Sequence, residues 1–479
     1  MPAHSGVTSP PGGRRHRIGL IVDHPKRDLG GAVLLANALA ARGVESALIP
    51  LYDQAIDVPL LDLDGLVVNF ARPVNKPLVD AYADLGIPVW VLDTEGGVLA
   101  ESGGNAPDAL AAWVRESGYA ERLAGYFFWG PVLRDAFVAG SGLSSASLHL
   151  TGCPRFDLTA PRWRGILEAP RKGYILANAN FPLVNSLFGT SSDDEKAAMV
   201  ESGWAPDYVD ALVDDLKGIA DRFVDVVSRV ADEFPGETIL VRPHPFENAE
   251  RYRTAFARRA NVIVDGGGSV LDVIANARCV LHVNCGTAVE ALRLGVLPLS
   301  LEFINTERLR THSTLPYRAS RNVETGDDLM AILRGLDEAT AQFDFDAAYR
   351  RTSEPWFYLN DGHASDRIAD VLVAAMAARR RARTRSVRTS LRSARRRPSA
   401  AQRAQAILAN AIGSQAASRL RARVQPRRAA KTLVKDAVGA LASRFSRHQA
   451  VSAPQVSSAR HPLTCLPLAS VIVSPGSDR

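Results

Sequence analysis

The chain has 479 residues, of which 46% are apolar and 23% are charged. This composition is typical of a soluble globular protein, and the length is sufficient for two or three domains. No apolar stretch reaches the roughly 18 residues that a membrane-spanning helix needs, and residues 1–15 lack the apolar core of a signal peptide, so we expect a cytoplasmic protein.

The net charge of +6 conceals two different parts of the chain. Residues 379–479 contain 22 Lys and Arg against 2 Asp and Glu, a net charge of +20. Residues 1–378 contain 35 Lys and Arg against 49 Asp and Glu, a net charge of −14. The sequence therefore indicates an acidic body that carries a basic tail.

Apolar runs alternate with helical patterns through the first third of the chain. Residues 1–15 are predicted to be disordered, residues 16–23 (HRIGLIVD) to form a strand and residues 29–43 to form a helix that stops at Gly43. Later strands are expected at 46–50, 65–69, 88–93, 126–129 and 147–151, and helices at 75–85, 106–116 and 132–139. This alternation predicts a doubly wound parallel sheet in residues 16–151.

A second alternating set follows a Pro- and Arg-containing connection at residues 152–172, where Arg155 and Asp157 are predicted to form a structural salt bridge. Its predicted strands are 173–178, 238–241, 261–264, 279–283 and 296–301, with a long helix at 207–234 and a last helix at 364–377. Residues 173–377 therefore form a second Rossmann-like domain, and we expect a cleft between the two halves.

The tail, residues 378–479, begins with an Arg/Ser run at 379–397. Residues 401–424 and 431–445 each fit a basic amphipathic helix; in the second, Val434, Val438, Leu441 and Phe445 share a face. Residues after 447 are predicted to be disordered. An anionic membrane surface is the favoured partner of this tail, a solvated extension is the alternative, and nucleic acid is disfavoured because no aromatics interleave with the arginines.

Two turns in the middle of the chain carry the strongest functional signal. Residues 239–247 (ILVRPHPFE) and 279–292 (CVLHVNCGTAVEAL) each read as a buried strand, a short polar turn and a helix start. Such turns lie at the carboxyl ends of neighbouring strands, where ligands bind in open α/β sheets. Because the second turn also presents backbone N–H groups at a helix N-terminus, it predicts an anion site.

With these turns the chain resembles bacterial surface-carbohydrate (capsule and lipopolysaccharide) biosynthesis proteins of glycosyltransferase-B type. The matching stretches are VRPHPFENAERYR (241–253), HVNCGTAVEALRLGVLPLS (282–300), TGCPRFDL (151–158) and DHPKRDLGGAVLLANALAARG (23–43). The resemblance covers residues 16–376 and none of the tail. A His-Pro turn followed by a Ser/Thr turn is also similar to CMP-sugar-using sialyl- and Kdo transferases, in which the His-Pro turn lies at the nucleotide phosphate.

The resemblance implies that His244 and Pro245 contact the donor phosphate, with Gly286 and Thr287 as the Ser/Thr turn. Pro243 and Pro245 fix the turn and aim the imidazole, which would donate to a phosphate oxygen or protonate the leaving nucleotide. Arg242 would bind phosphate in a bidentate way or form a salt bridge at the strand end. The other predicted donor-binding residues are Asn180, Asn284, Ala288 and Glu290.

Thr287 and Glu290 also fit a capping box at the helix start, while Glu290 alternatively reaches a ribose hydroxyl. The resemblance implies an acceptor-activating base after the 88–93 strand, which falls on Glu95; Asp28, in the loop after the first strand, is the second candidate. No cofactor is expected. The four cysteines have no metal-binding spacing and no DxD lies at a strand end, so we expect a metal-independent site.

Together these features predict a glycosyltransferase in cell-surface polysaccharide biosynthesis, peripheral at the inner face of the membrane. It would move a sugar from a nucleotide-sugar, with a CMP-linked donor as the first candidate, to a glycan or lipid-linked acceptor. One alternative is a nucleotide-sugar 2-epimerase of the same fold. The other is a non-catalytic, membrane-associated polysaccharide assembly factor.

Overall fold

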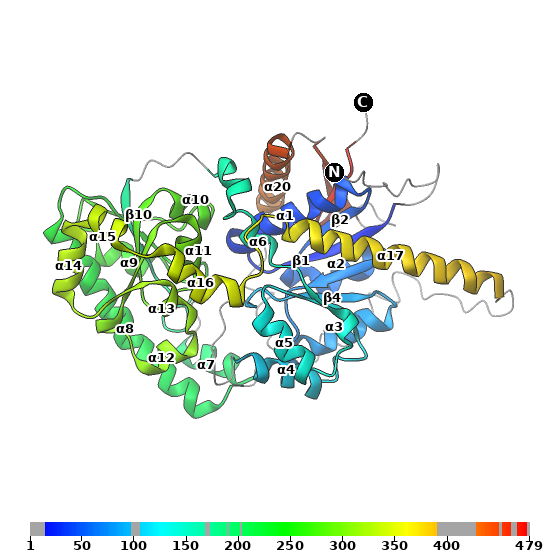
Figure 1. Ribbon diagram of the computed structural model, residues 1–479, viewed down its shortest axis with the longest axis horizontal. Helices are drawn as coiled ribbons and strands as arrows, with labels where there is room; N and C mark the ends of the chain where they lie inside the picture. The colour runs from blue at the N-terminus through cyan, green and yellow to red at the C-terminus, as the bar shows by residue number, and fades with distance from the viewer. Residues whose placement is uncertain are drawn as a thin grey trace.

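The computed structural model describes residues 15–96, 106–167, 173–187, 189, 191–201, 204–389, 428–449, 453–460 and 467–476. These residues form two α/β domains side by side, each built on one sheet covered by helices (Figure 1). The first sheet has eight strands and the second has six. The predicted fold class, two doubly wound α/β domains, is confirmed.

The amino-terminal sheet has the strand order β13-β14-β2-β1-β3-β4-β5-β6, and the neighbours from β2 to β6 are parallel. Its parallel strands are β1 (Arg17–Val22), β2 (Glu45–Pro50), β3 (Gly65–Val68), β4 (Val89–Leu92), β5 (Leu123–Phe128) and β6 (Leu148–Leu150). The connecting helices are α1 (Pro25–Ala41), α2 (Gln54–Leu60), α3 (Lys76–Asp84), α4 (Pro107–Glu116) and α5 (Pro131–Gly140). The strands are nearly continuous apolar runs because helices bury both of their faces.

The carboxyl-terminal sheet is wholly parallel in the order β12-β11-β10-β7-β8-β9. Its strands are β7 (Tyr174–Asn178), β8 (Ile239–Arg242), β9 (Val262–Val264), β10 (Ala277–His282), β11 (Leu297–Leu301) and β12 (Arg321–Val323). Its helices are α7 (Ser192–Glu201), α8 (Pro206–Glu233), α9 (Glu250–Ala255), α10 (Val270–Ala275), α11 (Thr287–Leu294), α12 (Glu307–His312), α13 (Leu315–Ala319), α14 (Gly326–Arg334), α15 (Leu336–Gln342) and α16 (Phe345–Trp356).

Strand order reverses once in each sheet, between β1 and β3 in the first and between β7 and β10 in the second. At such a point the loops after neighbouring strands diverge to opposite faces and leave a crevice at the carboxyl ends of the strands. The loops after β1, β4, β7, β8 and β10 thus meet between the two domains.

The chain crosses between the domains twice, and the two crossings are joined by a buried carboxylate. The first passes through α6 (Pro154–Asp157) and the 3-10 helix η5 (Pro161–Ile166), and the second leads into α17 (Ala364–Thr389), which packs on α1 of the first domain. Asp157 accepts the backbone N–H groups of Ala364 and Ser365 over 2.9 and 2.8 Å. Asp157 therefore caps α17, and the predicted salt bridge between Arg155 and Asp157 is wrong.

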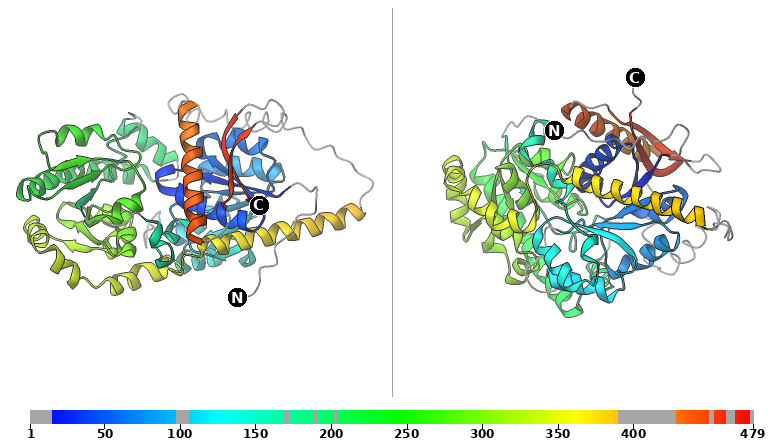
Figure 2. Two further views of the ribbon diagram at one scale, coloured as in Figure 1. Left: turned by 90° about the horizontal axis from the view of Figure 1, so that it is seen from above. Right: turned by 45° about the vertical axis from the view of Figure 1, so that its right-hand side comes forward.

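The carboxyl-terminal residues differ most from the sequence-based expectation. Helix α20 (Arg428–Gln449) packs against α1 and η5, and β13 (Gln455–Arg460) and β14 (Pro467–Ser474) extend the first sheet. Strand β14 pairs antiparallel with β2, so residues after 447 contribute two strands where disorder was predicted. Figure 2 shows α20 and these strands against the amino-terminal domain, while α17 projects beyond it.

The apolar face predicted to meet a membrane is instead part of the protein core. Val438 and Phe445 of α20 are 0% and 1% exposed, and Phe445 packs edge-on against Trp163, with ring centroids 5.8 Å apart. Asn37 of α1 donates to the carbonyl of Ala442 over 3.2 Å. The predicted helix at 401–424 and residues 1–14 lie outside the described residues. In the part of the chain that is described, no helix has the length and apolarity to cross a bilayer.

Candidate functional site

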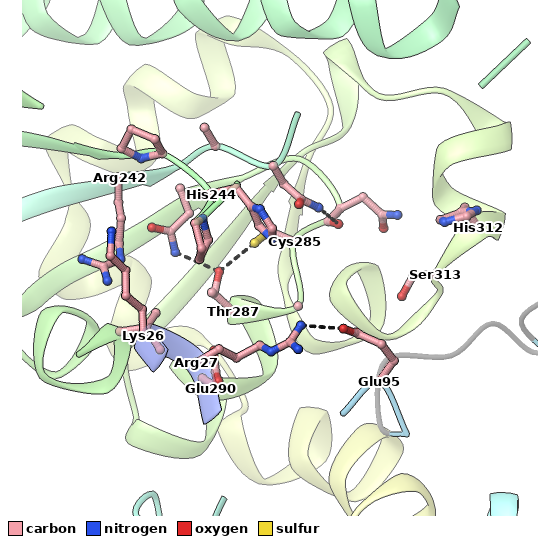
Figure 3. A pocket seen from close by; sticks show the side chains of 18 of the residues that line it. Lys26, Arg27, Glu95, Arg242, His244, Cys285, Thr287, Glu290, His312 and Ser313 are labelled. Carbon is pink, nitrogen blue, oxygen red and sulfur yellow. Dashed lines mark hydrogen bonds and ion pairs between the residues drawn. The ribbon is translucent and has the colours of Figure 1, made fainter. Parts of the chain in front are cut away.

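A cavity of about 410 Å³ lies between the two domains at the crevice defined by the two sheets. Four of its lining side chains come from the amino-terminal domain: Lys26, Arg27, Glu95 and Arg155. The other domain contributes the loops after β7, β8 and β10, the segment before α8 and the end of α12. Figure 3 shows Lys26 and Arg242 at one end of this cavity, Thr287 and His244 in its middle, and Glu95, Ser313 and His312 toward the other end.

His244 enters the cavity wall from the turn after β8 in a fixed orientation. Its backbone N–H donates to Glu247 Oε2 over 2.8 Å, and its Nδ1 accepts the backbone N–H of Phe246 over 3.2 Å. The second contact leaves the ring proton on Nε2 in the neutral tautomer. Burial, followed by the charge of Arg27, lowers the pKa of His244 to about 3. A neutral imidazole that donates through Nε2 is thus available at this wall.

The helix N-terminus predicted after β10 is present, and the helix begins one residue earlier than a capping box of Thr287 and Glu290 requires. Asn284 adopts the left-handed conformation (φ 49°), Gly286 precedes the helix, and Thr287 is its first residue. Thr287 Oγ1 accepts from Asn178 Nδ2 over 2.8 Å and donates to Cys285 Sγ over 3.1 Å. Its hydroxyl does not cap α11, so the capping-box interpretation of Thr287 and Glu290 is wrong.

Glu290 lines the cavity on the same face of α11 as Thr287 and pairs with the other domain. Its Oε1 accepts from Arg155 Nε and Nη2 over 2.9 and 2.6 Å, and its side chain is 0% exposed. Its Oε2 is buried and accepts no hydrogen bond from any described residue. A buried acceptor without a partner is costly, and a ligand hydroxyl would satisfy it.

Arg242 and Lys26 give one end of the cavity its positive charge. Arg242 donates to the carbonyls of Gly267 and Gly268 over 2.5 and 2.9 Å, so its predicted strand-end salt bridge is replaced by backbone contacts. Burial lowers the pKa of Arg242, and burial together with the charge of Arg242 lowers the pKa of Lys26. Two cations confined in one place favour a ligand group there that is anionic or rich in hydrogen-bond acceptors, such as the carbonyl oxygens of a nucleobase.

Arg27 connects the two candidate bases. Its guanidinium donates to Glu95 Oε1 over 2.6 Å, to Asp28 Oδ1 over 2.9 Å and to Asp23 Oδ2 over 2.6 Å. Glu95 lines the cavity with its side chain 50% exposed, whereas Asp28 does not line it and accepts the backbone N–H of His24 over 3.0 Å. Of the two, Glu95 alone can reach a substrate in this cavity.

The structure brings most of the predicted site residues into one wall. Asn180 donates to the carbonyl of Asn284 over 3.2 Å. Together with Pro245, Gly286 and the residues described above, both asparagines line the cavity. Ala288 does not: it is 0% exposed and packs in the hydrophobic core beneath α11. No cluster of three or more His, Cys, Asp or Glu side chains suited to a metal occurs among the residues that the structure describes.

Several lining residues were not predicted from the sequence. Arg155 lies in α6, the first part of the domain crossing, which packs on α1 of the amino-terminal domain. Five other residues come from the segment before α8 and from α12 and its end: Met199, Trp204, Leu309, His312 and Ser313. An isolated tryptophan in a polar segment (ESGWAPDY, 201–208) was the one available signal for this second group. Nothing in its spacing connects it with α12, about a hundred residues later.

Comparison with known proteins supports the fold. No protein-family model matches the chain, and no curated protein matches it. Among solved structures, a single-residue variant of the wall teichoic acid polymerase TagF can be superposed on this chain. The alignment covers 76% of this chain and 90% of the TagF chain, with 10% sequence identity and a TM-score of 0.50. This chain has the glycosyltransferase-B fold. At that identity the likeness concerns the fold alone.

Two nucleotide-sugar epimerase structures also align, with lower scores. The alignment with the UDP-GlcNAc 2-epimerase from Methanocaldococcus jannaschii covers 75% of this chain and 100% of the epimerase chain, with 13% sequence identity and a TM-score of 0.46. A putative UDP-N-acetylglucosamine 2-epimerase from Listeria monocytogenes covers 76% and 97%, at 12% identity and a TM-score of 0.47.

Proposed function

We propose that the protein is a glycosyltransferase of cell-surface polysaccharide biosynthesis. It would move a sugar from a nucleotide-sugar, with a CMP-linked donor as the first candidate, to a glycan or lipid-linked acceptor. The observation that carries this proposal is the gathering of positively charged groups in the interdomain cavity. There, Lys26, Arg27 and Arg155 of one domain face His244 and the N-terminus of α11 in the other.

Phosphate binding at this place has a direct physical basis. The N-terminus of a helix carries roughly half a positive charge, and an anion there also gains hydrogen bonds from backbone N–H groups. His244 adds a neutral donor through Nε2, because its Nδ1 already accepts from Phe246. Its pKa of about 3 favours hydrogen-bond donation to the phosphate over proton transfer in the empty site. The proposal invokes no metal because these groups supply positive potential themselves.

The remaining roles follow from position along the cavity. Glu290 would accept a ribose hydroxyl through the buried Oε2. The nucleobase would lie toward Lys26 and Arg242, and the transferred sugar toward Glu95. Glu95 would take the proton of the acceptor hydroxyl as general base, with Arg27 holding the carboxylate through Oε1 over 2.6 Å. This orientation places nucleotide and acceptor at opposite ends of one cavity.

Membrane association is proposed for the basic residues 379–427 rather than for α20. The apolar face of α20 is occupied by the protein's own core, so the attraction would be electrostatic, at about 1 kcal/mol per basic residue close to an anionic surface. Binding of the full chain to phosphatidylglycerol vesicles should then weaken steeply with salt. Salt-independent binding would contradict an electrostatic anchor.

Nucleotide binding to the full chain tests the proposed function. Calorimetric titration with CMP, CDP, UDP, GDP and ADP should show binding of one base in preference to the others. His244→Ala should lose that binding, because it removes the Nε2 donor from the phosphate site. His149→Ala is the matched control, since His149 is a partly buried histidine in β6 that does not line the cavity.

The result of this titration distinguishes the three candidate functions: transferase, epimerase and non-catalytic assembly factor. If a folded wild-type protein binds none of the five nucleotides, the transferase proposal is overturned and the assembly factor becomes the better hypothesis. If the protein binds one nucleotide, a nucleotide-sugar that carries the same base is incubated with the protein, and the reaction is followed by proton NMR. Conversion of the sugar to its C2 epimer without any acceptor identifies an epimerase instead.

A further inference from the structure

The far end of the cavity carries an aromatic group that none of the roles above uses. Trp204, in the segment before α8, and His312, at the end of α12, both line the cavity, and Tyr208 lies behind them in α8. Met199 and Leu309 add apolar surface beside them, and Ser313 adds a hydroxyl. In Figure 3 His312 and Ser313 lie on the side of Glu95, away from Lys26 and Arg242.

The three rings are packed so that one face of Trp204 is supported from within the domain. Trp204 and Tyr208 are stacked with centroids 5.5 Å apart and an angle of 18°, and Trp204 and His312 lie 5.2 Å apart at 37°. Rings stacked on opposite faces of an indole would be separated by about 7 Å, twice the contact distance of carbon atoms. The centroids of Tyr208 and His312 are 6.0 Å apart, so both support the same face of Trp204.

The support is fixed by a hydrogen bond between the two supporting rings. Tyr208 Oη and His312 Nδ1 are 2.8 Å apart. Burial lowers the pKa of His312 to about 4, so the imidazole is neutral and contributes a ring face rather than a charge. Trp113 of α4, from the other domain, approaches Trp204 in a T-shaped contact at 6.4 Å. Trp204 is therefore held from both domains and remains part of the cavity wall.

We propose that Trp204, supported by Tyr208 and His312, is the platform on which a pyranose ring of the substrate stacks. This inference rests on the proposed function, because it takes the Glu95 end of the cavity as the place of sugar transfer. A pyranose presents an apolar face of C–H groups and a rim of hydroxyls. The indole with Met199 and Leu309 fits the face, and Ser313 and Asn284 fit the rim.

A nucleobase would also stack on an indole, and position decides between the two. In Figure 3, His244 and Thr287 lie between His312, which contacts Trp204, and the Lys26–Arg242 end. The buried Oε2 of Glu290 is proposed to accept a ribose hydroxyl. The Glu290 side chain also lines a second cavity, to which Lys26 contributes. The nucleoside thus extends away from Trp204, and the sugar extends toward it.

Saturation-transfer NMR on the full chain tests the platform. The probes are methyl pyranosides of glucose, galactose and N-acetylglucosamine, standing for the acceptor, and the nucleotide-sugars UDP-glucose, UDP-N-acetylglucosamine and CMP-N-acetylneuraminate, standing for the donor. We expect Trp204→Ala to weaken the best-bound pyranose by about tenfold, the range of one aromatic contact, and Trp204→Phe to restore most of it. Tyr208→Phe, which keeps the ring and removes the bond to His312, should weaken it less.

Free nucleotide is the internal control. If Trp204→Ala loses binding of the methyl pyranosides alone, the platform belongs to the acceptor. If it loses binding of the nucleotide-sugars alone, the platform belongs to the transferred sugar. The platform is overturned if Trp204→Ala binds every pyranose as wild type does, if no pyranose contacts the wild-type protein, or if Trp204→Ala loses free nucleotide. In the first two cases nucleotide binding that depends on His244 would leave the proposed function standing.

Discussion

Replacing Arg155 with Met tests the ion pair that joins the two domains in the wall of the candidate site. Arg155 donates twice to Glu290, whose side chain is 0% exposed, while that of Arg155 is 13% exposed. Removing the guanidinium leaves a buried carboxylate without its partner, a change that costs about 3–5 kcal/mol. Since 1 kcal/mol shifts the unfolding midpoint of a domain of this size by about 2–4 °C, we expect a fall of about 6–20 °C.

Differential scanning calorimetry at neutral pH measures this change, and a double-mutant cycle isolates the pair. The double variant Arg155→Met/Glu290→Gln should lose less unfolding free energy than the two single variants lose together, by about 1–3 kcal/mol. Arg251→Met is the control: Arg251 pairs with Asp221 over 2.7 Å, but Asp221 is 80% exposed, and exposed pairs contribute about 0–1 kcal/mol. Additive single effects, or a shift for Arg155→Met no larger than for Arg251→Met, would refute the reasoning.

Three further predictions concern packing and pH. Burial lowers the pKa of the fully buried His282 to about 3, so between about pH 6.5 and 3 the unfolded chain binds a proton that the folded chain does not. His282 should therefore lower the free energy of unfolding by about 1.4 kcal/mol for each unit that the pH falls within this window. In His282→Gln, the urea midpoint should depend less steeply on pH across the same window. A Cβ on Gly31 would lie 2.6 Å from the backbone nitrogen of Arg155, whereas one on Gly218 meets nothing within 4 Å. In chemical denaturation, Gly31→Ala should cost about 1–3 kcal/mol and Gly218→Ala should gain about 0.5–1 kcal/mol; equal effects would contradict the close contact of α1 with α6. Phe445→Ala should cost about 3–5 kcal/mol in thermal unfolding, with the exposed Arg447→Ala as control, and an unchanged midpoint would show that α20 does not belong to the core.

The fold was predictable because its signals are local. The strands expected at 65–69 and 279–283, observed as β3 (Gly65–Val68) and β10 (Ala277–His282), are short apolar runs between helical patterns. The turns that follow them fall at the carboxyl ends, near the points where strand order reverses. The same rule placed His244 and Thr287 in one cavity. The position of Ala288 could also have been read from the helix: Thr287 and Glu290 are three residues apart and share a face, whereas Ala288 is turned about 100° from Thr287, toward the core.

Contacts between distant segments could not be predicted in this way. Glu290 pairs with Arg155 from 135 positions away, and Arg242 is bound by carbonyls 25 and 26 positions later. A capping box and a salt bridge are the local explanations that a sequence suggests for such residues, and tertiary contacts replaced both. Composition misled the interpretation of residues after 447, because the apolar run ASVIV (469–473) is short and lies in a basic, polar segment.

The pairing of β14 with β2 also has a consequence for how the chain folds during synthesis. Ser470 donates to Asp57 across 413 positions of sequence. At about 5–20 residues per second, roughly 20–80 s separate the emergence of these two segments from the ribosome. During that interval the outer edge of β2 has no partner strand, and exposed edges of this kind pair readily with other chains. The amino-terminal sheet is therefore among the first structures to begin folding and among the last to be completed.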